Sequence, residues 1–299
     1  MNNITISVVI PTYNSSSTIS EALQSVIEQQ FDTNNVYIEI VIIDDGSKDQ
    51  ECLNEKIKNF KCTNSNVNIV DIYLPENVGG GEARNIGIKE SSGDYVSFLD
   101  SDDIWLCDKI SHQLKIYNES SVLTGKVIKG KNINCGTILP LLSKKENEYV
   151  SDALFLSNKL IQTSTFFMSK KIALDILFNP KLPRHQDYDF LLRAECLGYK
   201  IIQDDKPVSF WRVEDASSNR FLKKKASPEF FICWFNEYKK YMTKESQISY
   251  VSKNIFSACM ITKKINLFFK FLLFGNFKLL EVINVFFNII KWRLEKIFL

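Results

Sequence analysis

The first hundred residues alternate short apolar runs with segments of helical periodicity. Each apolar run is rich in β-branched residues and ends in polar or glycine-rich positions, which is typical of buried strands. Strands that alternate with helices predict an α/β domain with a mostly parallel central sheet. The expected strands cover residues 6–10, 38–43, 68–74 and 95–99, and the expected helices cover 20–30 and 83–90.

The pattern becomes less regular between residues 125 and 213. A helix over 187–197 and a strand over 207–211 are the clearest elements there. Beyond residue 226 the chain reads as helices rich in Phe, Ile and Lys. We therefore expect an α/β domain over 1–218 and an α-helical extension over 219–299.

Composition narrows the class of protein. Hydrophobic residues make up 45% of the 299 residues and charged residues 24%, as in ordinary globular proteins. The formal net charge of +2 is too small for a protein that holds nucleic acid through its overall field, so we expect no nucleic-acid partner. Seven scattered Cys and two His predict neither a disulfide framework nor a zinc site. Because the chain does not begin with a signal-peptide pattern, we expect it in the cytoplasm.

A cluster of acids follows the strand expected at 95–99. Its sequence is Asp100-Ser101-Asp102-Asp103, and carboxylates grouped at a strand end are costly without a cation or hydrogen-bond donors. A divalent Mg²⁺ or Mn²⁺ that keeps positions free for phosphate oxygens meets that need. The alternative is that these acids cap a helix beginning at Ile104.

Two further clusters follow neighbouring strands. Asp45, in Asp44-Asp45-Gly46-Ser47, can accept hydrogen bonds from a nucleobase or a ribose, or can belong to a simple turn. The loop at 79–81 departs from the dinucleotide-binding pattern, because Arg84 stands where the third glycine belongs. A cation at the start of a helix favours a nearby anion such as pyrophosphate; an ordinary surface arginine is the alternative.

In their order and spacing these segments resemble the family 2 glycosyltransferases, inverting enzymes of the GT-A fold, over about residues 4–218. That resemblance implies a nucleotide-sugar-binding half over 1–125 and an acceptor half over 126–218. The segments that carry it are Val8-Val9-Ile10-Pro11-Thr12-Tyr13-Asn14, Val41-Ile42-Ile43-Asp44-Asp45-Gly46-Ser47, Asn77-Val78-Gly79-Gly80-Gly81-Glu82-Ala83-Arg84-Asn85-Ile86-Gly87 and Phe98-Leu99-Asp100-Ser101-Asp102-Asp103.

The resemblance also assigns roles to single residues. Thr12, Tyr13 and Asp45 would hold the base, with Arg84 near the base or phosphates. Asp100 would contact ribose or sugar, and Asp102 would bind Mn²⁺ or Mg²⁺ on the diphosphate. The implied set of donor-binding residues is Pro11, Thr12, Tyr13, Asp45, Asn77, Gly79, Arg84, Asp100, Ser101 and Arg212.

The family's general base is usually the Asp of a Glu-Asp pair that opens a helix in the acceptor half. Here Gln186 replaces the Glu, so Asp187 is the expected base and Asp189, two positions on, the weaker candidate. The alternative for Asp187 is a helix N-cap with Arg193 as a structural partner. Further on, Glu214 stands near the place of the family's loop histidine, and Arg212 is expected to contact phosphate or to be structural.

The C-terminal extension is basic as well as aromatic. From residue 251 onward, eight Lys or Arg face two Glu, a local charge of +6, and no apolar run reaches the roughly 18 residues of a membrane span. An interfacial helix on an anionic membrane surface is one interpretation, and a helical cap or dimer interface is the other. The first places the protein peripherally at the inner face of the cell membrane.

Taken with these features, the resemblance implies an inverting, metal-assisted transfer of a hexose or N-acetylhexosamine from a UDP-sugar. The expected acceptor is a saccharide hydroxyl, on a lipid-linked glycan in capsule, O-antigen or exopolysaccharide assembly. Two alternatives stay open at this point. One is a metal-dependent phosphohydrolase or nucleotidyltransferase, and the other a non-catalytic nucleotide-sugar-binding partner subunit.

Overall fold

The computed structural model describes residues 3–31, 35–60, 66–213, 227–275 and 277–297. The chain divides into two compact units. Unit 1 comprises Met1–Glu146 and Lys159–Ser217, and unit 2 comprises Asn147–Asn158 and Ser218–Leu299. The expected domain boundary at residue 218 lies outside the described residues.

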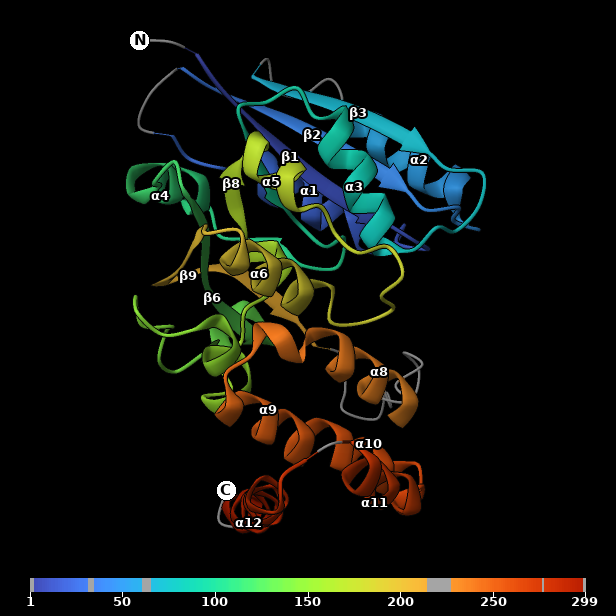
Figure 1. Cartoon of the computed structure of the whole chain (residues 1–299). Coiled ribbons are helices and arrows are strands. Elements are labelled where there is room, and N and C mark those ends of the chain that lie inside the picture. The colour runs from blue at the N-terminus through green and yellow to red at the C-terminus, as the bar shows by residue number, and fades with distance from the viewer. Residues whose placement is uncertain (1–2, 32–34, 61–65, 214–226, 276, 298–299) are drawn as a thin grey trace. The chain divides into compact units, whose positions relative to one another are not determined.

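Unit 1 is built on a nine-stranded sheet of order β3-β2-β1-β4-β8-β6-β9-β5, with β7 paired to β6 (Figure 1). The strands are β1 (Ile4–Thr12), β2 (Val36–Asp44), β3 (Val67–Tyr73), β4 (Tyr95–Phe98), β5 (Ile104–Trp105), β6 (Ser121–Gly130), β7 (Thr137–Leu139), β8 (Phe167–Ser169) and β9 (Lys200–Arg212). The α-helices are α1 (Ile19–Ile27), α2 (Gln50–Phe60), α3 (Gly80–Glu90), α4 (Lys109–Ile116), α5 (Lys170–Ile176) and α6 (Gln186–Cys196), and the 3₁₀ turns are η1 (Ile133–Cys135) and η3 (Thr163–Thr165).

The strands β3, β2, β1 and β4 are parallel, as expected, and the sheet is mixed beyond β4. In the shared register Thr12 lies opposite Asp44, and Val9 lies opposite Phe98. The carboxyl ends of β1, β2 and β4 therefore meet at one edge, where ligands collect in open α/β sheets.

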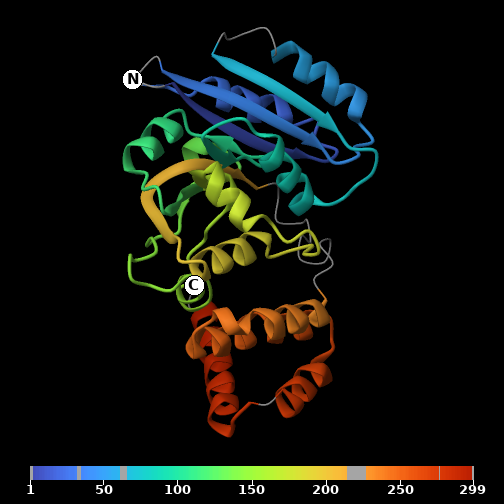
Figure 2. The same ribbon diagram turned by 45° about the horizontal axis from the view of Figure 1, so that its top comes forward.

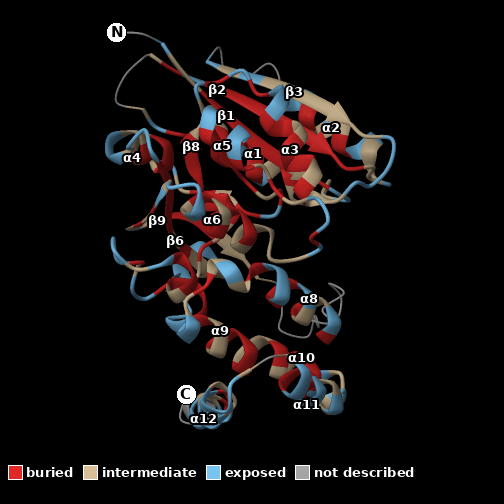
Figure 3. Cartoon of the chain, viewed as in Figure 1, coloured by how far each residue is buried: buried red, intermediate tan, exposed pale blue. Residues whose placement is uncertain are grey.

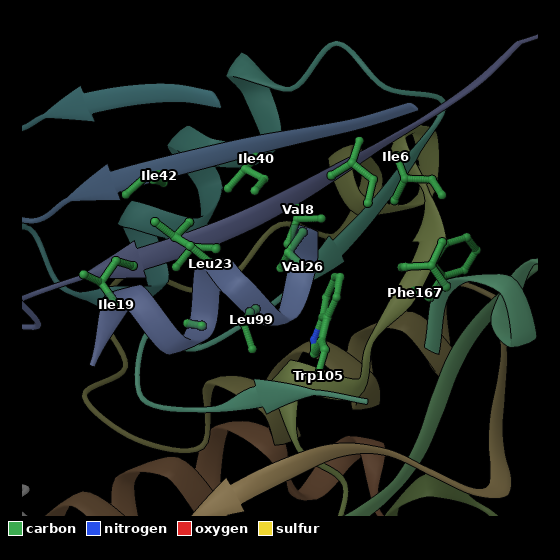
Figure 4. Packing of buried hydrophobic residues seen from close by; sticks show 14 of the residues in the cluster. Ile6, Val8, Ile19, Leu23, Val26, Ile40, Ile42, Leu99, Trp105 and Phe167 are labelled. Carbon is green, nitrogen blue, oxygen red and sulfur yellow. The ribbon is translucent and has the colours of Figure 1, made fainter. Parts of the chain in front are cut away.

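Apolar side chains cover both faces of the parallel strands, which explains the continuous apolar run of β2. Ile40 and Ile42 belong to the cluster that packs against α1, where Leu23 and Val26 fill the space (Figure 4). The alternate residues of β2 join a second cluster with Ala83 of α3. The acid-bearing edge thus rests on a rigid support.

All eight elements expected from the sequence are present, with shifted ends. The expected strand at 207–211 is the second half of β9, which begins at Lys200. The alternative of a helix at Ile104 is wrong, because β5 occupies Ile104–Trp105 and α4 begins at Lys109. The acids that precede it therefore cap no helix at that point.

Unit 2 is helical. Asp152 accepts hydrogen bonds from the hydroxyls of Thr243 and Ser246, and the ring of Phe155 contacts Tyr250 at 5.1 Å, so residues 147–158 belong with the C-terminal helices. In Figure 2, α12 (Leu279–Ile297, red) lies crosswise to the helical segment that runs from α9 (Lys244–Tyr250) to α10 (Phe256–Ile261) in orange. None of the described helices is long and apolar enough to span a membrane. The elements are η2 (Asp152–Leu156), α8 (Pro228–Tyr238), η4 (Lys239–Tyr241), α9 (Lys244–Tyr250), η5 (Val251–Ile255), α10 (Phe256–Ile261), α11 (Ile265–Phe274) and α12 (Leu279–Ile297).

Candidate active site

The turn after β2 presents Asp45 to the first turn of α3. Its buried carboxylate accepts hydrogen bonds from the backbone amides of Val78 (2.6 Å) and Gly79 (2.9 Å). Burial raises the pKa of Asp45, while the two amide donors oppose that rise. Gly46 has φ +69°, and a Cβ there would lie 2.8 Å from the backbone carbon of Glu76, so the turn requires glycine. Through these two hydrogen bonds, Asp45 holds the loop that leads into α3.

Arg84 is the centre of a hydrogen-bonded group. Its guanidinium donates to Asp100 at 2.5 Å, to the Gln186 side-chain oxygen at 3.0 Å and to the Gly80 carbonyl at 3.1 Å. The side chain is nearly buried, and its Nε has no hydrogen-bond partner among the described residues. The surface-arginine alternative is therefore wrong, and Arg84 links α3, the end of β4 and α6.

Asp187 lies in the first turn of α6, next to this group. Burial raises the pKa of its carboxyl to about 6; the amide of Tyr188 and the charge of Arg84 oppose that rise, and the charge of Asp100 adds to it. A carboxylate with this pKa is ionised at neutral pH and more basic than an ordinary aspartate. The arrangement can accept a proton beside a cation.

The neighbouring acid of α6 has a different position. Asp189 is fully buried and pairs with Arg193 through both carboxylate oxygens, at 2.8 and 2.6 Å. His185, not Asp187, is the N-cap residue of α6. Arg193 is therefore the partner of Asp189, and the N-cap alternative for Asp187 is wrong.

The acids after β4 separate into buried and exposed groups. Asp103 is buried and accepts from the Ser164 hydroxyl at 2.6 Å and the Gln162 amide at 2.7 Å, whereas Asp102 is exposed. Sequence reasoning missed Gln162 and Ser164, because they lie in the irregular middle of the chain and carry no pattern of their own.

The exposed acid of this segment could hold a divalent cation that takes most of its other ligands from a diphosphate. Asp102 offers an exposed carboxylate at the sheet edge, and Asp100 lies two residues before it. In the described part of the chain no three His, Cys, Asp or Glu residues form a metal-holding group by themselves. Mg²⁺ is commonly bound by one or two carboxylates together with substrate phosphates, which matches this donor set.

The end of β1 contributes both structural and exposed residues. Thr12 is buried, and its hydroxyl lies 3.2 Å from the Asp44 carboxylate, whereas Tyr13 is exposed. Pro11 is half-buried on β1, opposite Ile43. The structure therefore makes Tyr13, more than Thr12, accessible to a ligand.

Two smaller contacts complete this edge. The Ser101 hydroxyl donates to the Ser15 hydroxyl at 2.8 Å. This hydrogen bond joins the acidic segment 100–103 to the loop after β1. Asn77 donates its side-chain amide to the Asp45 carbonyl at 3.1 Å. Both side chains lie at the carboxyl edge, as the sequence predicts.

Arg212, at the end of β9, pairs with Glu21 in the first turn of α1. Its hydrogen bonds with Glu21 are the main cause that raises the pKa of Arg212, and the charges of Asp102 and Asp103 add to it. The contact with Glu21 could not be predicted from the sequence, because the two residues lie 191 positions apart. Glu214 and the rest of the expected loop lie outside the described residues.

The site thus combines acids at a parallel-strand edge, an arginine at a helix start and an aspartate with a raised pKa, an arrangement that can bind a phosphorylated ligand and accept a proton. The glycosyl transferase family 2 model matches residues 7–176, and the chain belongs to that family. It is therefore a glycosyltransferase, which sets aside the phosphohydrolase, nucleotidyltransferase and non-catalytic alternatives.

Two curated relatives illustrate the family. The amylovoran biosynthesis glycosyltransferase AmsB of Erwinia amylovora is 30% identical over 265 residues, covering 84% of this chain and 83% of AmsB. The UDP-Glc:alpha-D-GlcNAc-diphosphoundecaprenol beta-1,3-glucosyltransferase WfgD of Escherichia coli is 30% identical over 122 residues, covering 41% of this chain and 44% of WfgD.

Solved structures show the same GT-A fold. TarS of S. aureus in complex with UDP-GlcNAc has a TM-score of 0.58 at 21% identity, covering 95% of this chain and 78% of that chain. The mannosyltransferase PcManGT of Pyrobaculum calidifontis in complex with GDP-Man and Mn²⁺ has a TM-score of 0.60 at 12% identity, covering 97% and 88%. The fold class expected from the sequence is confirmed.

Proposed function

We propose that the protein transfers a hexose or N-acetylhexosamine from a UDP-sugar to a saccharide hydroxyl, with inversion at the anomeric carbon. The observation that carries this is the position of Asp187, a carboxylate with a pKa of about 6, beside Arg84 and Asp100. A proton acceptor next to a cation suits attack by a hydroxyl and departure of a diphosphate.

In the transfer step the acceptor oxygen attacks the anomeric carbon, while the bond from that carbon to the diphosphate breaks. The leaving diphosphate takes the bonding electron pair, and Asp187 takes the hydroxyl proton. Arg84 stabilises the charge that develops on the leaving group. Asp45 keeps the first turn of α3 in place, and Arg212 adds a second positive charge near Asp102.

A divalent cation, Mn²⁺ or Mg²⁺, fits the exposed carboxylate of Asp102. When bound it would neutralise charge on the diphosphate as a Lewis acid. The structure of the mannosyltransferase PcManGT in complex with GDP-Man and Mn²⁺ supports this choice of metal.

The acceptor we propose is a lipid-linked saccharide in polysaccharide assembly at the inner face of the cell membrane. AmsB is named for amylovoran biosynthesis, and the name of WfgD gives a diphosphoundecaprenol acceptor. The choice of UDP is supported by the donor that the name of WfgD gives, UDP-Glc.

Calorimetric titration with UDP, GDP and dTDP, with and without Mn²⁺, tests the donor site. We expect Mn²⁺-dependent preference for UDP, weakened at least tenfold in Asp102→Asn, because one carboxylate of the metal site becomes neutral. Asp175→Asn is the matched control. Asp175 lies on α5 and accepts a hydrogen bond from the Tyr199 hydroxyl, so it is no part of the proposed metal site. Wild-type protein that binds none of the three nucleotides would contradict the proposal.

A further inference from the structure

The two C-terminal helices present a surface that the transfer chemistry does not use. The inner face of α12 is already packed, since Val285 and Ile289 are buried. The Ser252 hydroxyl donates to the Val285 carbonyl at 3.2 Å and ties α12 to η5. The inward-facing residues therefore account for the folding of α12 onto unit 2.

The opposite face of α12 is apolar too. Leu279 is 77% exposed and Phe287 67% exposed, although a helix on a protein surface normally needs a single apolar face. Figure 3 shows the exposed residues along α12 in pale blue. Positions three, four or seven apart share one face of a helix. The apolar residues exposed on this face are Leu279, Leu280, Ile283, Phe287, Ile290 and Leu294.

Helix α11 extends this surface. Leu273 is 79% and Phe274 81% exposed, and the Phe269 ring stacks on Phe286 of α12 with centroids 6.3 Å apart. This ring contact links the two helices beside their exposed residues. We call the exposed apolar residues of α11 and α12 together the tail face.

Positive charge accompanies the tail face. Lys270 lies on the exposed side of α11, and Lys291 lies beside the apolar stripe of α12. Within the described residues neither makes an ion pair. From residue 251 onward the sequence contains eight Lys or Arg residues and only two Glu. A second copy of the same face would bring cations against cations, whereas anionic lipid phosphates would neutralise them.

We propose that the tail face binds an anionic membrane surface, with α11 and α12 lying in the headgroup region. The exposed Leu, Ile and Phe side chains enter the upper acyl layer, and Lys270 and Lys291 reach lipid phosphates. This binding goes beyond sugar transfer and does not depend on it. For a lipid-linked acceptor, it holds the protein at the surface where that acceptor resides.

Co-sedimentation of the full chain with vesicles tests the tail face. We expect binding to phosphatidylglycerol vesicles and at least tenfold weaker binding to phosphatidylcholine vesicles. Ile283→Glu/Phe287→Glu should weaken phosphatidylglycerol binding at least tenfold, because two charges would enter the apolar layer. The control Leu141→Glu/Leu142→Glu changes two exposed leucines of unit 1 and should bind as the wild type does.

A second pair tests the charges. Lys270→Glu/Lys291→Glu should weaken phosphatidylglycerol binding by about fivefold or more for each cation removed. Lys58→Glu/Lys171→Glu makes the same charge change on exposed positions of unit 1 and should have a much smaller effect. Circular dichroism of each variant checks that the helices are retained.

Unchanged vesicle binding by Ile283→Glu/Phe287→Glu would overturn the proposal. So would a wild-type dimer that this variant converts to monomers in sedimentation velocity, because the tail face would then belong to a second copy. UDP titration of the same variants separates the two proposals. Vesicle binding without UDP binding refutes the donor site alone, and UDP binding without vesicle binding refutes the tail face alone.

Discussion

At the scale of single residues, the chemistry depends on how α6 meets α3. Gln186 accepts from Arg84 at 3.0 Å and donates to the Leu182 carbonyl at 2.7 Å, so its amide is held in one orientation. A neutral amide positions Arg84 without cancelling its charge. Asp187, the next residue, lies close enough to Arg84 for that cation to oppose the rise that burial causes in its pKa.

Gln186→Glu should move the acid limb of the pH profile. In the wild type we expect kcat/KM to rise with pH through about 6, because Asp187 must be ionised to accept a proton. A carboxylate at position 186 adds a like charge beside Asp187 and raises its pKa, so the limb should move up by about one pH unit. Gln186→Asn keeps the site neutral and should leave the limb in place. An unmoved limb in Gln186→Glu would refute this positioning role.

At the scale of elements, α3 lies very close to β1, and this contact fixes the edge where the site forms. A Cβ at Gly87 would lie 2.3 Å from Cγ1 of Val9, closer than any real contact. The small residue therefore lets α3 approach the sheet and places Arg84 within reach of Asp100.

Gly87→Ala should lower the free energy of unfolding by about 1–3 kcal/mol, because the added methyl group overpacks the contact between α3 and β1. Urea denaturation measures the change. Val9→Ala removes the side chain that clashes, so the double variant Val9→Ala/Gly87→Ala should lose less than the sum of the two single changes. Strict additivity would show that the methyl group is accommodated elsewhere.

Elements that show local periodicity could be predicted from the sequence, whereas elements that depend on pairing between distant residues could not. The strand of β1 and the helix of α3 have clear local periodicity and were predicted from the sequence. The first half of β9 was missed, because Gln203-Asp204-Asp205-Lys206 is polar and Pro207 interrupts the pattern. The structure pairs it with β6 through a register shift near Thr124, which no local pattern reveals.

The same distinction holds for the site. Asp45, Arg84 and Asp100 were expected at one edge, and the structure places them there. The contacts of Arg84 with Gln186 and of Asp103 with Ser164 join residues 102 and 61 positions apart. Such pairs depend on tertiary packing rather than on periodicity, so sequence reasoning gave no sign of them.

At the scale of the whole molecule, charge and chemistry are distributed unevenly. The acids, Arg84 and Asp187 belong to unit 1, whereas the basic and aromatic tail face belongs to unit 2. The whole chain has a net charge of +2, whereas the segment from residue 251 onward carries +6. This division separates transfer from membrane binding, so we expect variants of the tail face to leave UDP affinity unchanged.

The central claim is that Asp187 accepts the proton of the attacking hydroxyl. The most direct measurement is the rate of transfer by Asp187→Asn, from the nucleotide sugar that calorimetry selects, alongside the affinity for that donor. We predict a loss in kcat of about 10²–10⁴-fold with donor affinity retained, because Asn keeps the shape but accepts no proton. Transfer at the wild-type rate would remove Asp187 from the mechanism.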